Sequence, residues 1–341
     1  MRKITISGTK QSEILIGEQL SNLKDYFPQK NTVIITDSNL KQLYNSQFPK
    51  ASIIEIGLGE DIKNLQTVDS IIKQLVELQA DRHTFIVGIG GGIVCDITGF
   101  VASIYMRGVD FGFVSTSLLS QVDASVGGKN GVNFNNYKNI IGNFNQPKFV
   151  ICDSQMLHTL PPKEVKNGMS EILKHALIAD AQMFHLIREK SEQILNLEER
   201  IIEDLIYENI KIKAAFVEKD EKEQGERKKL NFGHTLAHAI EKNSNLSHGE
   251  AVAIGIVFAA KISHQKKYIS ETDLTLIIES VKQLGLPISS NIKPELLADA
   301  IINDKKRQGK NISFVLLNKI GEARIENLTI TELKQWIYDL C

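Results

Sequence analysis

The sequence predicts an α/β protein with two domains: a Rossmann-like domain with a mostly parallel sheet, followed by a mostly α-helical domain. Two observations predict this fold. In the first half, short runs rich in Val, Ile and Phe alternate with stretches of helical spacing, as in βαβ units. After Pro161 and Pro162 the pattern changes to long helical stretches. We therefore expect domains at residues 1–162 and 163–341, with the active site in the cleft between them.

The strands of the first domain are expected at its β-branched runs. Residues 1–6 alternate as a strand does, and further strands are expected at residues 32–36, 52–56, 84–88, 112–116 and 148–152. Helical spacing occupies residues 39–44 and 64–78 between them. Sheets of this kind bind ligands at the carboxyl ends of their strands, so we expect functional residues there.

Long helices fill the second domain. Helical spacing predicts them at residues 164–179, 197–219, 230–243 and 249–267. Near the end of the chain, residues 312–316 and 323–325 form a weak β pair. No flexible linker separates the two halves, so we expect them to pack closely.

Composition excludes several classes of partner. Lys and Arg number 40 against 41 for Asp and Glu, so no global positive field attracts nucleic acid or an anionic membrane. No apolar run is long enough to cross a bilayer, and the first residues lack the apolar stretch of a secretion signal. The three cysteines are too few and scattered for a disulfide framework. We expect a cytoplasmic protein.

The segment Gly88-Ile-Gly-Gly-Gly-Ile-Val-Cys-Asp96 follows a strand and opens a helix. Glycines there let the backbone approach a pyrophosphate, and the helix N-terminus supplies N–H donors. The segment departs from Gly-x-Gly-x-x-Gly at Ile93, and tight strand-to-helix packing is the alternative to nucleotide binding. Asp37, at the end of an earlier strand, either takes a ribose hydroxyl or caps the helix that follows it.

A second segment, from Asp123 to Asn133, concentrates glycines, amides and Lys129, and Lys138 and Asn139 come soon after it. Backbone N–H groups and ammonium groups together can hold a phosphate or a carboxylate. We interpret the segment as an anion-binding loop. An ordinary solvated loop is the alternative.

The third signal is a histidine cluster. His234 and His238 are spaced i, i+4 on one helix face, and His248 opens the next helix. Upstream, residues 171–175 place Glu, Lys and His on one face of an apolar helix. A catalytic zinc needs three such ligands and an open position. The Glu that a His-Glu-x-x-His protease needs is absent, because residues 235–237 are Thr, Leu and Ala.

A cationic and amide set precedes His234. It consists of Lys213, Glu223, Arg227 and Asn231, of which the last two are one helical turn apart. A guanidinium and an amide at these positions can lie on the metal's side of the cleft. The alternative is that residues 220–229 form an ordinary solvated loop. Late in the chain, Asp304-Lys-Lys306 either closes the site or faces water.

Together these segments closely resemble the 3-dehydroquinate synthases. The resemblance runs in order from residues 59–63 to 304–306. It rests on the strings Gly-Gly-Gly-Ile-Val-Cys-Asp96, Tyr105-Met-Arg107-Gly, Gln121-Val-Asp-Ala-Ser-Val-Gly-Gly-Lys129, Gly168-Met-Ser-Glu171-Ile-Leu-Lys174, Leu230-Asn-Phe-Gly-His234 and His248-Gly-Glu-Ala-Val.

The resemblance implies a lyase that depends on NAD and on zinc, with cobalt as another possible metal. Its substrate would be 3-deoxy-D-arabino-heptulosonate 7-phosphate, and its products 3-dehydroquinate and phosphate. The implied reaction passes through transient oxidation by NAD, β-elimination of phosphate, re-reduction and an intramolecular aldol closure. NAD is therefore recycled, and the enzyme would serve the shikimate pathway and the biosynthesis of aromatic amino acids.

The resemblance also assigns residues. The metal ligands would be Glu171, His234 and His248. The NAD-binding residues would be Asp37, Glu60, Lys63, Gly91, Gly92, Asp96, Thr116, Ser117, Lys129 and Lys138. The catalytic residues would be Asp123, Lys129, Lys174, Lys213, Glu223, Arg227, Asn231 and His238. Further substrate contacts would be Arg107, Lys138, Asn139 and Lys305 or Lys306, and since Arg107 would reach the neighbouring subunit's site, a homodimer is implied.

The chain departs from the family pattern at three places. Ser115-Thr-Ser117 stands where Pro-Thr-Thr is usual, Asn130 replaces a Thr, and Cys95 replaces a Gly beside the phosphate turn. Ser117 keeps a hydroxyl for a hydrogen bond to NAD, whereas Cys95 adds bulk.

Two other enzyme classes compete with this assignment. The first is a zinc-dependent polyol or glycerol phosphate dehydrogenase, in which Lys129, Lys138, Lys213 and Arg227 would be surplus. The second is another sugar phosphate cyclase, whose substrate lacks the carboxylate. Such a cyclase would be expected to lose part of the group Lys213, Arg227 and Asn231, which this chain keeps.

Overall fold

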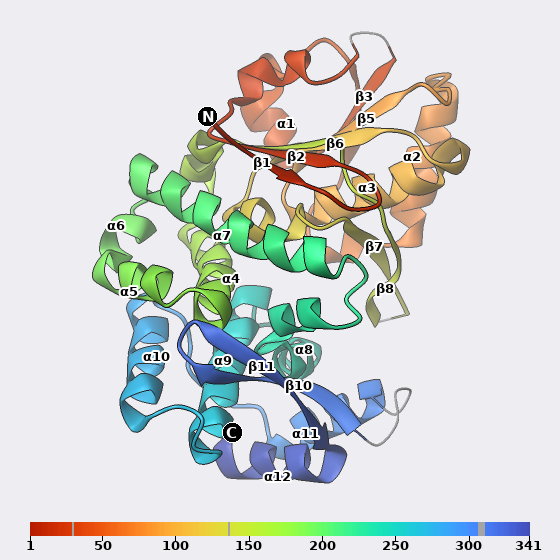
Figure 1. Cartoon of the computed structure of the whole chain (residues 1–341). Coiled ribbons are helices and arrows are strands. Elements are labelled where there is room, and N and C mark those ends of the chain that lie inside the picture. The colour runs from red at the N-terminus through yellow and green to blue at the C-terminus, as the bar shows by residue number, and fades with distance from the viewer. Residues whose placement is uncertain (29–30, 136, 306–310) are drawn as a thin grey trace. The chain divides into compact units, whose positions relative to one another are not determined.

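The computed structural model describes residues 1–28, 31–135, 137–305 and 311–341. These residues form two compact units (Figure 1). The first contains Met1–Leu160 and Ile202–Lys222, and the second contains Pro161–Ile201 and Glu223–Cys341. Most of helix α7 (Glu199–Lys219) thus belongs with the first unit, although the sequence-based division at residue 162 places it in the second. Within the described part of the chain, no helix combines the length and apolar character that a membrane span requires.

A seven-stranded sheet forms the centre of the first unit, counted over the described residues. Its order is β1-β2-β9-β6-β5-β3-β4, and every neighbouring pair except β1 and β2 is parallel. The predicted, mostly parallel sheet is confirmed. Its strands are β1 (Arg2–Ile6), β2 (Ser12–Ile16), β3 (Thr32–Asp37), β4 (Ser52–Ile56), β5 (Phe85–Gly90), β6 (Phe111–Ser115) and β9 (Phe149–Cys152).

Both faces of this sheet are covered. Alternate residues of each strand face opposite sides, and one side, which includes Ile34, Val87 and Ile151, packs under η1 (Leu20–Asp25) and α1 (Ser38–Tyr44). The other side carries α3 (Gly92–Ile104). A Cβ at Gly88 would lie 2.8 Å from the hydroxyl oxygen of Thr98, so this glycine lets α3 approach the sheet closely. Next to α3 lies α2 (Leu65–Glu77).

A separate hairpin of β7 (Lys129–Phe134) and β8 (Tyr137–Phe144) also belongs to the first unit. The expectation of a loop from Asp123 to Asn133 is therefore wrong for its second half. The hairpin packs on α3, where a Cβ at Gly99 would lie 1.9 Å from the side-chain oxygen of Asn130. Polar and glycine residues dominate β7, so no apolar alternation marks it as a strand.

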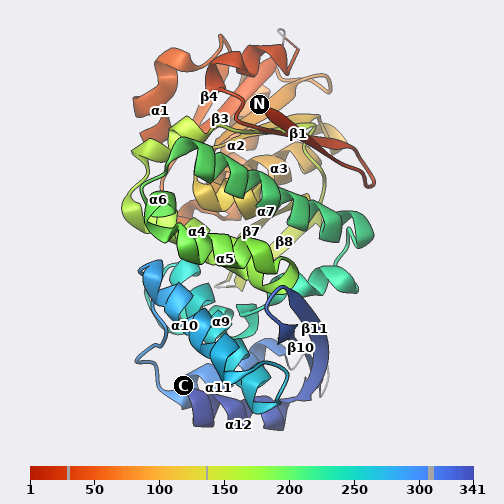
Figure 2. The same ribbon diagram turned by 60° about the vertical axis from the view of Figure 1, so that its left-hand side comes forward.

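The second unit is built around α9 (His248–Gln265), which is buried along most of its length. Helices α4, α8 and α10 and strand β10 all contact α9. Figure 2 shows α4, α9, α10 and β10 from another side. The other elements are α4 (Pro162–Ala179), α5 (Ala181–Glu189), α6 (Ser191–Leu195), η7 (Glu226–Asn231), α8 (His234–Asn243), α10 (Glu271–Gln283), α11 (Pro294–Lys305), β10 (Asn311–Lys319), β11 (Glu322–Thr329) and α12 (Ile330–Leu340). The predicted helices and the late β pair are confirmed, except that η7 replaces the start of the helix expected from residue 230.

Candidate active site

Residues predicted to bind NAD follow the carboxyl ends of four parallel strands in the first unit. Asp37 ends β3, η3 (Glu60–Ile62) follows β4, Gly91 follows β5 and Thr116 follows β6. The chain places β4 on one side of β3 and β5 on the other, so the strand order reverses between β3 and β5. Ligands of open α/β sheets bind at such a reversal.

The turn from β5 to α3 has the geometry of an anion site. Gly91 precedes α3 without a side-chain cap, so the first backbone N–H groups of the helix have no side-chain acceptor there. A Cβ at Gly90 would lie 2.3 Å from the Cβ of Val94, which only glycine avoids. These residues fit the pyrophosphate of a dinucleotide, and their role stays a prediction.

Asp37 shows the second of its two expected roles. Its carboxylate accepts a hydrogen bond from the backbone N–H of Leu40 at 2.9 Å and caps α1. Burial raises the pKa of Asp37, and the hydrogen bond from Leu40 opposes that rise. A ribose contact through the other carboxylate oxygen stays a prediction.

Four of the predicted NAD and substrate residues form one polar network. Lys63 Nζ lies 2.5 Å from Asp96 Oδ2 and donates to Asn139 Oδ1 at 2.6 Å. Asn133 Nδ2 donates to Glu60 Oε1 at 2.7 Å, and Asn133 Oδ1 accepts from the backbone N–H of Asn139 at 2.8 Å. The pKa of Asp96 is raised by burial, and the Lys63 ammonium offsets only part of that rise. The network joins η3, α3 and the β7–β8 hairpin.

Helix α7 brings a distant lysine to this unit. Lys213 Nζ lies 2.5 Å from Asp123 Oδ1, in the π-helical turn η5 (Ser120–Ala124). Ser117 lies in the turn before η5 and is half-buried. Arg107, Lys129 and Lys138 are exposed.

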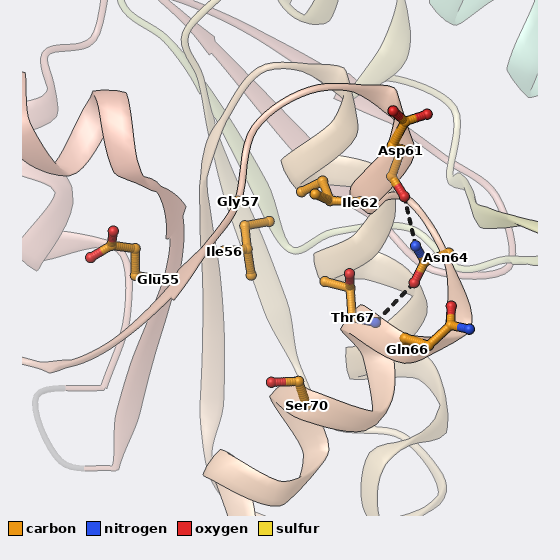
Figure 3. A pocket seen from close by; sticks show the side chains of 9 residues that line it. All are labelled: Glu55, Ile56, Gly57, Asp61, Ile62, Asn64, Gln66, Thr67 and Ser70. Carbon is orange, nitrogen blue, oxygen red and sulfur yellow. Dashed lines mark hydrogen bonds between the residues drawn. The ribbon is translucent and has the colours of Figure 1, made fainter.

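Figure 3 shows a pocket of the first unit, formed by the end of β4, the segment after it and the start of α2. In it, Asn64 donates to the backbone oxygen of Asp61 at 2.6 Å and accepts from the N–H of Thr67 at 3.0 Å, which caps α2. Its described lining includes none of the predicted site residues, and consists of Glu55, Ile56, Gly57, Asp61, Ile62, Asn64, Gln66, Thr67 and Ser70. The pocket has no paired catalytic groups, so we assign it no chemistry.

The three predicted metal ligands meet in the second unit. Glu171 comes from α4, His234 is the first residue of α8 and His248 is the first residue of α9. Glu171 Oε1 lies 3.1 Å from His248 Nε2 and 3.5 Å from His234 Nε2. The three ligand atoms all lie within 4.8 Å of one another.

Local sequence fixes where α8 and α9 begin. Gly233 has a φ of 81° and precedes His234, and a Cβ at Gly255 of α9 would lie 2.0 Å from the Gly233 carbonyl oxygen. Only glycine at position 255 lets the start of α8 contact α9 so closely. A capping box of Ser247 and Glu250 makes His248 the first residue of α9.

The charges and the burial of the cluster shift the pKa values of all three predicted ligands. Burial raises the pKa of Glu171, but the Lys174 ammonium and the two imidazoles hold it well below its usual value. Burial, aided by Lys174, lowers the pKa of His234 to about 3. Burial also lowers the pKa of His248, but Glu171 and Glu241 raise it to about 10. An anionic carboxylate and two imidazoles are a donor set that zinc prefers.

The remaining predicted residues of this unit differ in their contacts and in their burial. The His238 ring lies 5.6 Å from the His234 ring, centroid to centroid, and is exposed. Asn231 Nδ2 donates to Glu223 Oε1 at 2.5 Å, and Arg227 is buried. Lys174 is buried against Glu171. Lys305 is the last residue of α11, and Lys306 lies outside the described residues.

One carboxylate near the cluster was not predicted from the sequence. Glu241 Oε1 lies 3.4 Å from His248 Nδ1. Its spacing, seven residues after His234, places it on the same face of α8, but this spacing alone does not indicate the contact with His248 of α9.

The two units together define a class of proteins with a known fold. Over 98% of this chain and 97% of the other, the structure is similar to ValA, a 2-epi-5-epi-valiolone synthase from Streptomyces hygroscopicus subsp. jinggangensis 5008, with a TM-score of 0.88 and 24% identity. It is similar to 2-deoxy-scyllo-inosose synthase over 99% and 100% of the chains, with a TM-score of 0.82 and 25% identity. A probable glycerol dehydrogenase from Sinorhizobium meliloti 1021 shares the fold at a TM-score of 0.68 and 15% identity, over 96% and 95% of the chains. The fold is thus one that cyclases and dehydrogenases share.

Sequence comparison identifies the family within this class. A model of the 3-dehydroquinate synthase N-terminal part matches residues 53–167, and a model of the C-terminal part matches residues 168–307. A 3-dehydroquinate synthase of Alkaliphilus metalliredigens is 42% identical, over 90% of this chain and 89% of its own. One of Dehalococcoides mccartyi strain CBDB1 is 38% identical, over 95% of both. The chain belongs to the 3-dehydroquinate synthase family.

Proposed function

We propose that this enzyme converts 3-deoxy-D-arabino-heptulosonate 7-phosphate to 3-dehydroquinate and phosphate. The family and the curated relatives support this reading. The structural observation that carries the proposal is the cluster of Glu171, His234 and His248, which three separate helices bring together in the second unit.

Two cofactors follow from the same reading. The metal would be held by Glu171, His234 and His248, whose burial and donor types fit zinc or cobalt. NAD would be held in the first unit at the β5–α3 turn and by the network of Lys63 and Asp96. The ValA structure is described with NAD⁺ and Zn²⁺, and the inosose synthase structure with NAD⁺ and Co²⁺.

Each group has a distinct chemical part. When bound, NAD supplies a reversible hydride acceptor and the metal supplies an electrophile for hydroxyl and ketone oxygens. Lys129, Lys138 and Lys213 in the first unit, and Arg227 in the second, supply cationic donors for the phosphate and carboxylate of the substrate. Buried Lys174 compensates the charge of Glu171 and so keeps that carboxylate ionised.

Arg107 supports a further proposal about assembly. It lies exposed in η4 (Tyr105–Arg107), where its φ of 67° is in the left-handed region. We propose a homodimer in which Arg107 of one subunit contacts substrate bound by the other.

Product analysis tests the proposed reaction. We would incubate the metal-loaded protein with the heptulosonate phosphate and catalytic NAD, and follow the carbon skeleton by NMR. The proposal expects the carbocyclic product and one phosphate per ring formed. An open-chain keto product with stoichiometric NADH would instead indicate the dehydrogenase that shares this fold.

A further inference from the structure

The imidazole of His248 lies between two carboxylates. Its Nε2 is 3.1 Å from Glu171 Oε1, and its Nδ1 is 3.4 Å from Glu241 Oε1. The Glu241 side chain is only 5% exposed, whereas that of His248 is 32% exposed. Glu241 lies on the far side of the ring from Glu171. A buried carboxylate costs free energy unless it is paired or hydrogen-bonded, because charge is poorly solvated in the interior.

Helix α8 presents Glu241 on the same face as His234. The two are seven residues apart, with His238 between them, and positions i, i+4 and i+7 share a helix face. Helix α8 therefore carries both the predicted ligand His234 and the carboxylate that contacts the predicted ligand His248 of α9. Since α8 and α9 contact each other closely at Gly233 and Gly255, the separation of Glu241 from His248 depends on the packing of these two helices.

The His234 ring has the same orientation, but its Nδ1 faces a backbone oxygen in place of a carboxylate. Its Nε2 faces Glu171 at 3.5 Å, and its Nδ1 lies 3.3 Å from the backbone oxygen of Phe232. Both rings thus turn Nε2 toward the cluster and Nδ1 toward an acceptor. Histidine ligands of metals usually have such an acceptor, which fixes the tautomer with Nδ1–H and leaves the Nε2 lone pair for the metal.

We propose that Glu241 is a positioning residue of the metal centre: it accepts the Nδ1–H of His248 and thereby holds Nε2 toward the metal. This inference rests on the proposed function, because it assumes that Glu171, His234 and His248 bind a metal ion. Glu241 itself would not touch the metal or the substrate.

Two substitutions separate the parts of this role. Glu241→Ala removes the acceptor, so the His248 ring can turn and its Nε2 becomes a poorer ligand. Glu241→Gln keeps a carbonyl acceptor but loses the negative charge, so it should retain part of the effect. Loss of such outer partners typically weakens metal affinity by about 10–100-fold.

The experiment measures zinc affinity by competition with a chromophoric chelator, together with the melting temperature of the metal-free proteins. Glu332→Gln is the matched control, because it also removes one carboxylate of the second unit. Among the described residues, the Glu332 carboxylate accepts hydrogen bonds only from Thr329, at the start of α12. We expect Glu241→Ala to bind zinc about 10–100-fold more weakly, Glu241→Gln to fall between it and the wild type, and the control to bind as the wild type does. The absorption spectrum of the cobalt-loaded protein should also change in the Glu241 variants, which a purely structural role would not cause.

Two results would overturn the inference. One is unchanged zinc affinity in a folded Glu241→Ala variant. The other is a Glu241→Gln variant with the zinc affinity and the cobalt spectrum of the wild type. This second result can be obtained even if Glu241→Ala fails to fold. His248→Ala separates this failure from that of the proposed function: if the wild type binds no zinc, or His248→Ala binds it as tightly, the metal centre itself is wrong.

Discussion

Glu171 carries a negative charge where no water reaches it. The side chain is completely buried, and its partners are the Lys174 ammonium and the two imidazoles of His234 and His248. Removing one member of a buried ion pair leaves the other charge uncompensated. At the scale of single residues, the Lys174 ammonium therefore compensates the charge of Glu171 even before a metal ion binds.

Glu171→Gln tests this arrangement. The amide leaves Lys174 buried without its anion, so the free energy of unfolding of the metal-free protein should fall by about 3 kcal/mol or more. Urea denaturation measures the loss, and Glu332→Gln again serves as the control. A metal-free variant as stable as the wild type would mean that the ion pair is not buried as the structure shows.

A second ionic contact predicts a pH dependence of stability. Burial raises the pKa of Glu326, but hydrogen bonds from Lys266 at 2.5 Å and Tyr268 at 2.9 Å outweigh it and lower the pKa. A carboxyl with a lowered pKa in the folded state stabilises the protein above its unfolded pKa, and this contribution disappears as pH falls through the folded pKa.

Glu326→Gln should therefore lower the free energy of unfolding near pH 7 by roughly 0.5–1 kcal/mol, because the pair is partly solvated. The difference should shrink once the pH falls below the ordinary carboxyl pKa of 4.5. Thermal denaturation across pH measures it. A difference that is constant with pH would contradict the assigned cause.

Among the helices, α8 and α9 depend on one contact between glycines. A Cβ at position 255 would lie 2.0 Å from the carbonyl oxygen of Gly233. Alanine normally favours a helix over glycine by about 1 kcal/mol, so a substitution with free space would stabilise α9. At position 255 the clash with the Gly233 carbonyl oxygen makes the same substitution destabilising.

Gly255→Ala should lower the free energy of unfolding by about 1–3 kcal/mol, the range for overpacked sites. It should also weaken zinc binding, since the start of α8 carries His234. Denaturation and chelator competition measure the two effects. Increased stability with unchanged zinc affinity would show that the helices separate at no cost.

The elements also show what the sequence can predict. The β5–α3 turn was predictable because its glycines follow a run of β-branched residues, and helical spacing predicted the helix that carries His234 and His238. The β7–β8 hairpin was not, because its strands carry polar residues and glycines and pair only with each other among the described strands. Glu241 was missed because its part depends on the approach of α9, which spacing within α8 does not reveal.

At the scale of the whole molecule, sequence order and spatial grouping differ. Helix α7 follows α4, α5 and α6 of the second unit, yet its Lys213 pairs with Asp123, and its Glu218 accepts from the backbone N–H of Ser7 in the first unit. Such contacts between residues distant in sequence cannot be read from periodicity. The family resemblance, which relies on motifs along the chain, was confirmed by the matching models over residues 53–307.

The proposed dimer predicts complementation between inactive variants. Arg107→Ala and His248→Ala each damage a site in a different way. If Arg107 acts across the interface, a mixed dimer has one intact site, so random mixing should restore about a quarter of wild-type activity. Activity after unfolding and refolding the mixture measures this. No recovery, with both variants folded and dimeric, would place Arg107 in its own subunit's site.

The central claim is that NAD is recycled during a lyase reaction at this metal centre. Phosphate release and absorbance of NADH can be followed in the same sample, with substrate in large excess over NAD. The account predicts many phosphates released per NAD present and no accumulation of NADH. NADH that rises in proportion to turnover, or the absence of phosphate, would contradict it.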